Sequence, residues 1–171
     1  MITLNEIEIR LVQHLAKMRY AYCREHGATA TLYGNIDKSE KAEAIKREMD
    51  YVGAELAFCK LHNIYPDLTH DTFRSSDCTL SNGETVDVKQ APGDNHRLLC
   101  KVEATKDHIR QGKELPDWYA LMVGIMPKYK FVGFMAASDL LQDSRINYSF
   151  PVPAYTATQH ELRLVIQLAE R

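Results

Sequence analysis

The sequence predicts a single α/β domain in which helices flank a central mixed β-sheet. Two stretches within the first 62 residues repeat apolar residues at intervals of three and four, as amphipathic helices do. After residue 63 the chain changes to short apolar runs divided by polar segments, which is typical of strands. With 171 residues and no repeats or linker, the chain is long enough to bury one core.

The first predicted helix covers about residues 4–26, with Gly27 as its terminator. Its apolar positions share one face: Leu4, Ile7, Leu11, Leu15, Met18 and Tyr22. The Lys- and Glu-rich stretch 37–48 predicts an exposed helix start or a solvated face, and a second helix is expected over about residues 41–62. We assign residues 1–36 to an N-terminal helical extension and residues 41–171 to the core and C-terminal helix of the same domain.

Three apolar runs in the second half predict strands: residues 97–102, 118–123 and 130–136. Residues 138–141 have the pattern of a short helix start, and Pro151 and Pro153 mark an extended segment. Thr158 is placed to cap a final helix over about residues 159–169.

The stretch 77–89 is the most informative part of the chain, because it predicts a β-hairpin that ends in Asp-x-Lys. Asp87 and Lys89 lie two residues apart, so they share one face of their strand. Asp77 lies on the facing strand. Two carboxylates and an ammonium on one face suit a hard divalent metal ion and a phosphodiester.

Two registers are open to this hairpin. A two-residue turn at Asn82-Gly83 would place Asp77 opposite Val88. A three-residue loop, with Gly83 left-handed in a bulge, would place Asp77 opposite Asp87. The second register also gathers the apolar side chains on the other face, namely Cys78, Leu80, Val86 and Val88. We therefore predict the bulged loop.

A third acid, Glu55, lies in the predicted second helix and shares a stripe with Tyr51 and Phe58. The small residues Gly53, Ala54 and Ala57 allow this helix to pack closely on a sheet. A carboxylate inside an apolar stripe is costly unless it is paired or binds a metal. The alternative is that Glu55 lies at the edge of the stripe and reaches solvent.

The composition is ordinary for a globular protein, with 45% apolar and 26% charged residues. A net charge of −2 argues against a protein coated in basic charge, but leaves a local basic groove open. Four scattered cysteines indicate reduced thiols in a cytoplasmic protein rather than a zinc site or a disulfide framework: Cys23, Cys59, Cys78 and Cys100. No apolar run has the length of a membrane span, and the N-terminus lacks the pattern of a signal peptide.

Four residues occur in a characteristic order along the chain: Glu55, Asp77, Asp87 and Lys89. In this order the chain resembles the PD-(D/E)xK, or restriction-endonuclease-like, nucleases, and the resemblance covers roughly residues 48–162. In that family a helix carries a Glu, one strand of a hairpin carries an Asp, and the next strand carries (Asp/Glu)-x-Lys. Further segments resemble small phage-encoded members: residues 53–57, 87–90, 117–123, 131–134 and, loosely, 154–162. Ser76 replaces the Pro of the family name, and the short stretch after Lys89 predicts a following helix that is reduced or displaced toward residues 103–112.

The resemblance implies a restriction-endonuclease-like core. It also implies a metal-dependent nuclease that hydrolyses phosphodiester bonds, with DNA as the expected substrate. The expected role of such an enzyme is phage DNA processing or recombination. Asp77 and Asp87, with Glu55 directly or through water, would hold Mg²⁺ or Mn²⁺. Lys89 would orient the attacking water or stabilise charge in the transition state. The expected location is the cytoplasm, that of the host if the protein is phage-encoded.

Nucleic-acid contacts are expected from the basic part of the chain that follows the hairpin. The candidate residues are Gln90, Arg97, Lys101, Lys106, Arg110 and Lys113. Two other classes stay open: an inactive nuclease-fold protein that binds nucleic acid or a host protein, and a structural module whose polar hairpin has no function. No membrane partner is expected, and a homodimer and a protein partner are left open.

Overall fold

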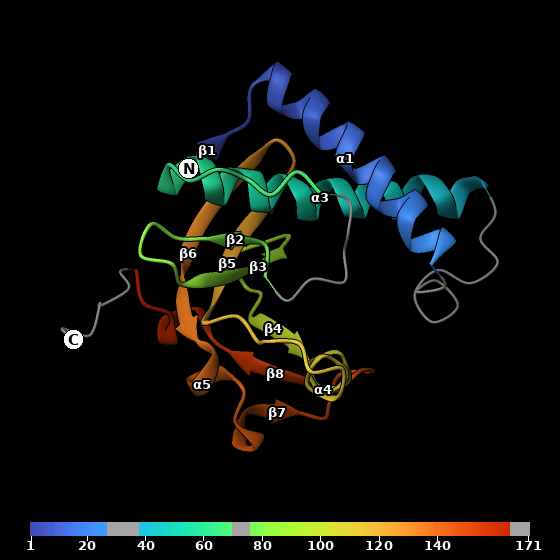
Figure 1. Ribbon diagram of the computed structural model, residues 1–171. Helices are drawn as coiled ribbons and strands as arrows, with labels where there is room; N and C mark the ends of the chain where they lie inside the picture. Colours follow the sequence, from blue (N-terminus) through green and yellow to red (C-terminus); the bar gives the residue numbers. More distant parts are fainter. Residues whose placement is uncertain (27–37, 70–75, 165–171) are drawn as a thin grey trace.

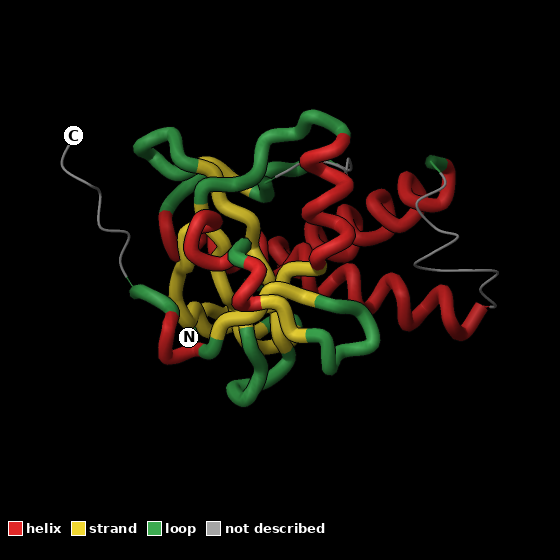
Figure 2. The backbone as a smooth tube through the Cα atoms, turned by 90° about the horizontal axis from the view of Figure 1, so that it is seen from below, coloured by secondary structure: helices red, strands yellow, loops and turns green. Residues whose placement is uncertain are grey.

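The computed structural model describes residues 1–26, 38–69 and 76–164, which form helices on one side of a five-stranded sheet and a smaller sheet on the other (Figure 1). Helices α1 (Glu6–Glu25) and α3 (Lys38–His62) pack against each other, and α3 lies directly on the larger sheet. Figure 2 shows the same arrangement from below, with the two long helices beside the strands. An α/β fold with helices beside a mixed sheet is therefore confirmed.

Helix α1 begins at Asn5, whose side chain accepts hydrogen bonds from the amides of Ile7 and Glu8, both at 3.0 Å. The Glu8 carboxylate in turn accepts from the Asn5 amide, which completes a capping box. The predicted helix is correct, but the face on which its apolar residues lie is only partly buried. Ile7 and Met18 are 79% and 42% exposed, while Arg19 is buried.

The larger sheet, sheet A, has the strand order β1-β6-β5-β3-β2. Its strands are β1 (Ile2–Thr3), β2 (Cys78–Thr79), β3 (Thr85–Ala91), β5 (Trp118–Ile125) and β6 (Lys128–Ala136). Strands β3 and β5 are parallel and the other neighbours are antiparallel, so the sheet is mixed as predicted. The parallel crossover from β3 to β5 contains α4 (Val102–Arg110), at the place expected for a displaced helix. Strand β1 was not predicted.

The smaller sheet, sheet B, is antiparallel and has the order β4-β8-β7. It contains β4 (Leu98–Lys101), β7 (Ile146–Asn147) and β8 (Ala154–Ala157). Short helical turns border it: α5 (Ala137–Leu140), η1 (Asp143–Arg145) and η2 (Gln159–Glu161). In the described residues no helix has a stretch long and apolar enough to cross a membrane.

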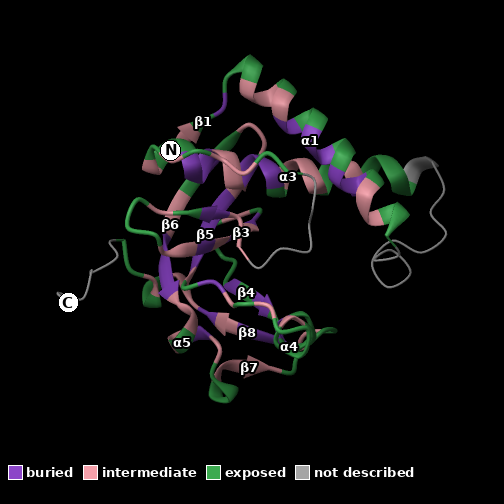
Figure 3. Ribbon diagram, in the orientation of Figure 1, coloured by how far each residue is buried: buried purple, intermediate pink, exposed green. Residues whose placement is uncertain are grey.

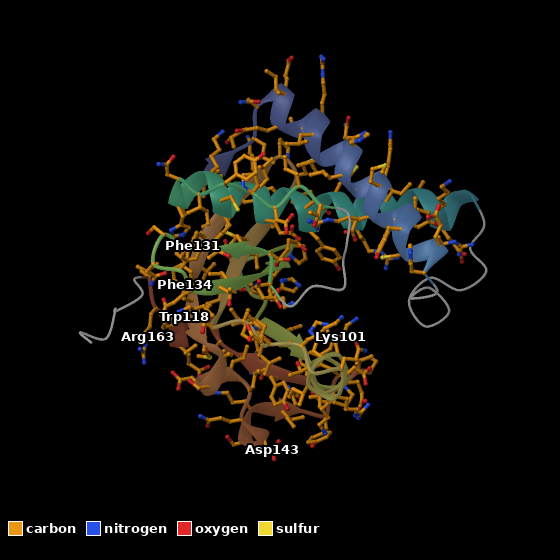
Figure 4. The ribbon with its side chains drawn as sticks, in the orientation of Figure 1. Lys101, Trp118, Phe131, Phe134, Asp143 and Arg163 are labelled. Atoms are coloured by element: carbon orange, nitrogen blue, oxygen red, sulfur yellow. The ribbon has the colours of Figure 1, made fainter. Side chains whose placement is uncertain are left out.

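The predicted C-terminal helix is wrong over the described residues. Thr158 does cap a helical turn, in a capping box with Glu161, but the turn ends at Glu161. Arg163 then pairs with β6, since its amide donates to the Phe134 carbonyl at 2.9 Å and its carbonyl accepts from the Phe134 amide at 2.7 Å. Figure 4 shows Arg163 at this edge of the molecule, near Phe134 and Trp118. Residues 165–171 lie outside the described residues.

Sheet A separates two apolar cores (Figure 3). Val86 and Val88 point toward α1 and α3, and Tyr119 and Leu121 point toward sheet B. The helical core depends on close approach, because a Cβ at Gly53 would overlap the hydroxyl of Tyr129. Asp87 and Lys89, which alternate with the two valines, consequently face the side of sheet B.

Candidate functional site

The hairpin between β2 and β3 has the predicted bulged loop. Cys78 pairs with Val86, and the Leu80 amide donates to the Glu84 carbonyl at 2.8 Å, which leaves three residues in the loop. Gly83 has a φ of 90°, in the left-handed region that favours glycine. The two-residue turn is thereby excluded, and the prediction of a three-residue loop is confirmed.

Asp77 departs from the predicted pairing at the end of this ladder. Its amide donates to the carbonyl of Val86 at 2.8 Å, so it does not continue as the regular partner of Asp87. Its carboxylate accepts a hydrogen bond from the amide of Val88 at 2.7 Å. The carboxylate thus replaces the main-chain carbonyl that a longer β2 would have offered to the Val88 amide. This hydrogen bond fixes the carboxylate at the edge of the sheet.

This position places Asp77 in a small hollow that Leu15, Val52 and Glu55 of α1 and α3 also line. Burial raises the pKa of Asp77 well above its usual value, and the negative charges of Glu55 and Asp87 raise it further. Lys89 and the Val88 amide oppose that rise without reversing it. The charge of Asp77, just before β2, therefore interacts with Glu55 of α3 and with Asp87 and Lys89 of β3.

Asp87 and Lys89 share one face of β3, as their spacing predicted, and they form an ion pair on the side of sheet B. The distance from Lys89 Nζ to Asp87 Oδ2 is 2.7 Å, and the two side chains are 32% and 19% exposed. The ammonium also lies 5.8 Å from the centre of the Tyr119 ring. Burial, the largest single effect, would lower the pKa of Lys89, but Asp87, Cys100 and Asp77 together outweigh it, so the pKa is raised and Lys89 stays protonated.

Glu55 is held by an arginine that the sequence did not reveal. Arg19 of α1 donates two hydrogen bonds to the Glu55 carboxylate, at 2.8 and 2.7 Å. Its side chain is 4% exposed and that of Glu55 is 14% exposed. The sequence held one signal of this pair. Arg19 follows the buried Leu15 by four residues, so a cation lies in the apolar stripe of α1, just as the carboxylate of Glu55 lies in the apolar stripe of α3.

A further acid, Glu48, lies two helical turns before Glu55 on α3 and was also missed. Its carboxylate is 3.9 Å from the guanidinium of Arg19. Burial raises the pKa of Glu48 to about 7; Arg19 opposes this shift and Glu55 adds to it. The acids therefore extend from the hairpin edge into the contact between α1 and α3.

Glu55 does not point into bulk solvent, so the alternative of a solvated stripe edge is wrong. Glu55 and Asp77 line the same small hollow, of about 10 Å³, between α3 and the loop at Pro66. This volume has room for about one water molecule. A water-mediated link between the two carboxylates is compatible with that space.

The fit to a divalent metal ion rests on two carboxylates. Among the described residues, no three His, Cys, Asp or Glu side chains are arranged to hold a metal ion. Mg²⁺, however, commonly takes one or two protein carboxylates and completes its shell with water and substrate phosphate. Asp77 and Asp87 are hard oxygen donors that interact across the hairpin, so their chemistry suits Mg²⁺ or Mn²⁺.

The predicted nucleic-acid contacts are spread over several environments. Arg97, Lys101 and Lys106 are exposed, and Lys101 lies at the α4 end of the molecule (Figure 4). Arg110 pairs with Asp107 at 2.6 Å, and Lys113 is half-buried. Gln90 donates to the carbonyl of Gly124 at 2.6 Å, so its side chain links β3 to β5.

Helix α4 nevertheless borders the hairpin site. Its His108 interacts electrostatically with both Asp87 and Lys89, and burial lowers the pKa of this histidine. The spacing of the histidines gave no indication of such a position. Helix α4 and the Asp87–Lys89 pair therefore share one side of sheet A.

Compared with known proteins, the chain matches no protein-family model, no curated protein and no solved structure. The structure by itself shows an α/β fold with a mixed sheet, in which Asp77, Asp87 and Lys89 gather at the β2–β3 hairpin.

Proposed function

We propose that the protein is a divalent-metal-dependent nuclease that hydrolyses phosphodiester bonds, with DNA as the preferred substrate. The observation that carries the proposal is the position of Asp77, whose carboxylate is fixed by the Val88 amide and lines one hollow with Glu55. The charges of Asp87 and Lys89 also act on it. Oxygen ligands beside a fixed ammonium are the groups that hydrolysis of a phosphodiester requires.

The roles follow from the position of each side chain. Asp77 and Asp87 would hold Mg²⁺ or Mn²⁺, and Glu55 would reach the ion through a water molecule. When bound, the ion would polarise a phosphoryl oxygen and lower the pKa of the attacking water. Lys89, kept protonated by Asp87, would stabilise the negative charge that develops on the phosphate as water attacks.

The order of elements supports the same assignment. Glu55 is on a helix, Asp77 precedes the first strand of a hairpin, and Asp87 and Lys89 are on the second strand. A helix and a parallel strand follow, in α4 and β5. This order resembles that of the PD-(D/E)xK nucleases, except that Asp77 precedes its strand, and it supports our proposal that the chain belongs to that superfamily. We further propose a role in phage DNA processing or recombination, with exposed cations such as Lys101 and Lys106 as contacts to phosphates.

A second candidate function is an inactive nuclease fold that binds nucleic acid or a protein partner. It is favoured by the two ion pairs, since Asp87 is paired with Lys89 and Glu55 with Arg19. A site closed by internal cations would keep the shape of the nuclease without its metal.

Cleavage of plasmid and oligonucleotide DNA with Mg²⁺ or Mn²⁺ separates the two functions. Asp87→Ala should lose a metal ligand and abolish cleavage. Lys89→Ala should still bind Mn²⁺ but slow cleavage by orders of magnitude, because Lys89 acts on the transition state. A wild-type protein that binds no divalent ion and cuts no nucleic acid would reject the nuclease in favour of the binding protein.

A further inference from the structure

Helix α1 carries a second row of apolar residues outside the face that packs on α3. The packed face consists of the buried residues of the helix: Val12, Leu15, Ala16, Arg19 and Tyr20. Ile7 and Met18 lie outside that face and are 79% and 42% exposed, and Leu11 between them is half-buried. In Figure 1, α1 is the outermost helix, with α3 between it and sheet A. An apolar row therefore lies beside the contact with α3 and is open to solvent.

The spacing of this row is that of a coiled-coil seam. It contains, at alternating intervals of four and three residues, Ile7, Leu11, His14, Met18 and Ala21. Such intervals keep all five residues on one stripe of a helix, where the a and d positions of a coiled coil lie. We call this stripe the α1 seam. Its geometry suits one further helix packed along α1.

The two flanks of the α1 seam differ in charge. Arg10 and Lys17 are exposed on one flank, and Arg24 continues the same row at a seven-residue interval. These are the g positions of the seam, whose charges pair with those of a partner helix. On the other flank Leu15 lines a small hollow with Leu68, which is itself 37% exposed. A helix on the seam would meet basic charge on one side and apolar surface on the other.

The charges favour an acidic helix over a second copy of this chain. In an antiparallel pair of α1 helices the g positions would meet, so Arg10 would lie close to Lys17 of the second copy. In a parallel pair they would meet the opposite flank, where Glu8 already pairs with Lys60 at 2.9 Å and Leu15 is buried. Carboxylates on the partner would instead pair with the basic row in either direction.

Nucleic acid and lipid fit this side of α1 less well. Phosphates would pair with the cations but would leave the exposed Ile7 and Met18 without contacts. An anionic lipid surface attracts a basic helix with a broad apolar face, whereas Glu6 and Glu25 at the two ends of α1 would be repelled by it.

We propose that the α1 seam docks a helix of a partner protein, which has apolar residues at its own a and d positions and Asp or Glu on the flank that meets Arg10 and Lys17. The docked helix would lie along α1 and cover Ile7 and Met18. The inference is independent of the proposed nuclease, because no residue of the seam belongs to the hairpin site.

The test uses two synthetic peptides of three heptads each, both with leucine at a and d. One has glutamate at e and g and the other has lysine, so each peptide repels itself and stays monomeric. In isothermal titration calorimetry the wild type should bind the glutamate peptide at least about tenfold more tightly than the lysine peptide. Added salt should narrow this difference, because Arg10 and Lys17 are exposed.

Variants separate the seam from its basic flank. Arg10→Glu/Lys17→Glu should reverse the preference between the peptides, and Met18→Gln should weaken the binding of both. Lys46→Glu/Arg47→Glu is the matched control, because it makes the same change of charge at exposed positions of α3, and it should keep the preference of the wild type. Lys17→Glu alone should shift the preference in the same direction if the double variant fails to fold.

Binding of neither peptide, or the same preference in the wild type and in the charge-reversed variant, would overturn the proposal. Sedimentation velocity and flotation with phosphatidylserine vesicles test the other occupants. A wild-type dimer that Met18→Gln dissociates would assign the seam to a second copy. Binding to the vesicles that Met18→Gln weakens would assign it to a lipid surface, and either result would likewise overturn the proposal.

Discussion

The two carboxylate–cation pairs of this protein differ in how they are made. Asp87 and Lys89 are two residues apart on one strand, and their side chains remain 19% and 32% exposed. Arg19 and Glu55 come from different helices, 36 positions apart, and are 4% and 14% exposed. The first pair is a product of local geometry, and the second exists only because α1 packs on α3.

The difference has energetic consequences. A partly exposed pair loses little when one member is removed, since water solvates the other. A buried pair loses much more, because the remaining charge stays in a medium that solvates it poorly. The hairpin pair can therefore change partners at a lower cost, whereas the helical pair is part of the framework of the fold.

The largest expected effect tests this contrast directly. Arg19→Met should lower the free energy of unfolding by about 3–5 kcal/mol, because it leaves Glu55 buried without its cation. Lys89→Met should lower it by less than Arg19→Met does, because the Asp87–Lys89 pair is the more exposed of the two. Urea denaturation of both variants measures the two losses, and equal losses would remove the distinction between the pairs.

A second, smaller effect is a pH dependence that arises on the helical side. The pKa of Glu48 is raised from 4.5 to about 7, so the folded state binds a proton more tightly than the unfolded state. The stability that Glu48 contributes is fully present below about pH 4.5 and is lost as the pH rises through about 7. The pKa of Asp77 is also raised, so its contribution to stability likewise falls as the pH rises.

Thermal melts without metal, from pH 4.5 to 8, measure this dependence. The melting temperature of Glu48→Gln should fall less across this range than that of the wild type. Parallel curves for the two proteins would show that Glu48 does not carry the proton.

Close packing of α3 on β6 predicts a third effect. Gly53→Ala should cost about 1–3 kcal/mol, since its Cβ would overlap the Tyr129 hydroxyl, which donates to the Asp50 carbonyl at 3.1 Å. Tyr129→Phe removes the hydroxyl, so Gly53→Ala should cost less in that background. A double-mutant cycle by urea denaturation gives the coupling, and additive losses would contradict the clash.

The smallest effect is expected in the hairpin loop. Gly83→Ala should cost about 1 kcal/mol, because alanine is disfavoured at a φ of 90° although no neighbouring atom lies within 4 Å of the new Cβ. Chemical denaturation checks this value. A loss as large as that of Arg19→Met would mean that the hairpin belongs to the rigid framework, contrary to the comparison above.

Local spacing was sufficient to predict much of this protein. The 3.6-residue period of apolar residues located α1 and α3. The preference of Gly83 for a left-handed conformation predicted the three-residue loop. The alternation of Val86 and Val88 with Asp87 and Lys89 predicted that the two charged residues share one face of β3. These features depend on neighbours only a few residues away, so the sequence determines them by itself.

Only the tertiary structure decided the rest. Arg19 reached Glu55 because two helices packed face to face, and the same packing left Ile7 and Met18 exposed although they lie on the apolar stripe. Arg163 left its expected helix because the edge of β6 offered main-chain partners at Phe134. Such choices depend on groups distant in sequence that compete for the same charges and hydrogen bonds, and no local pattern records the outcome of that competition.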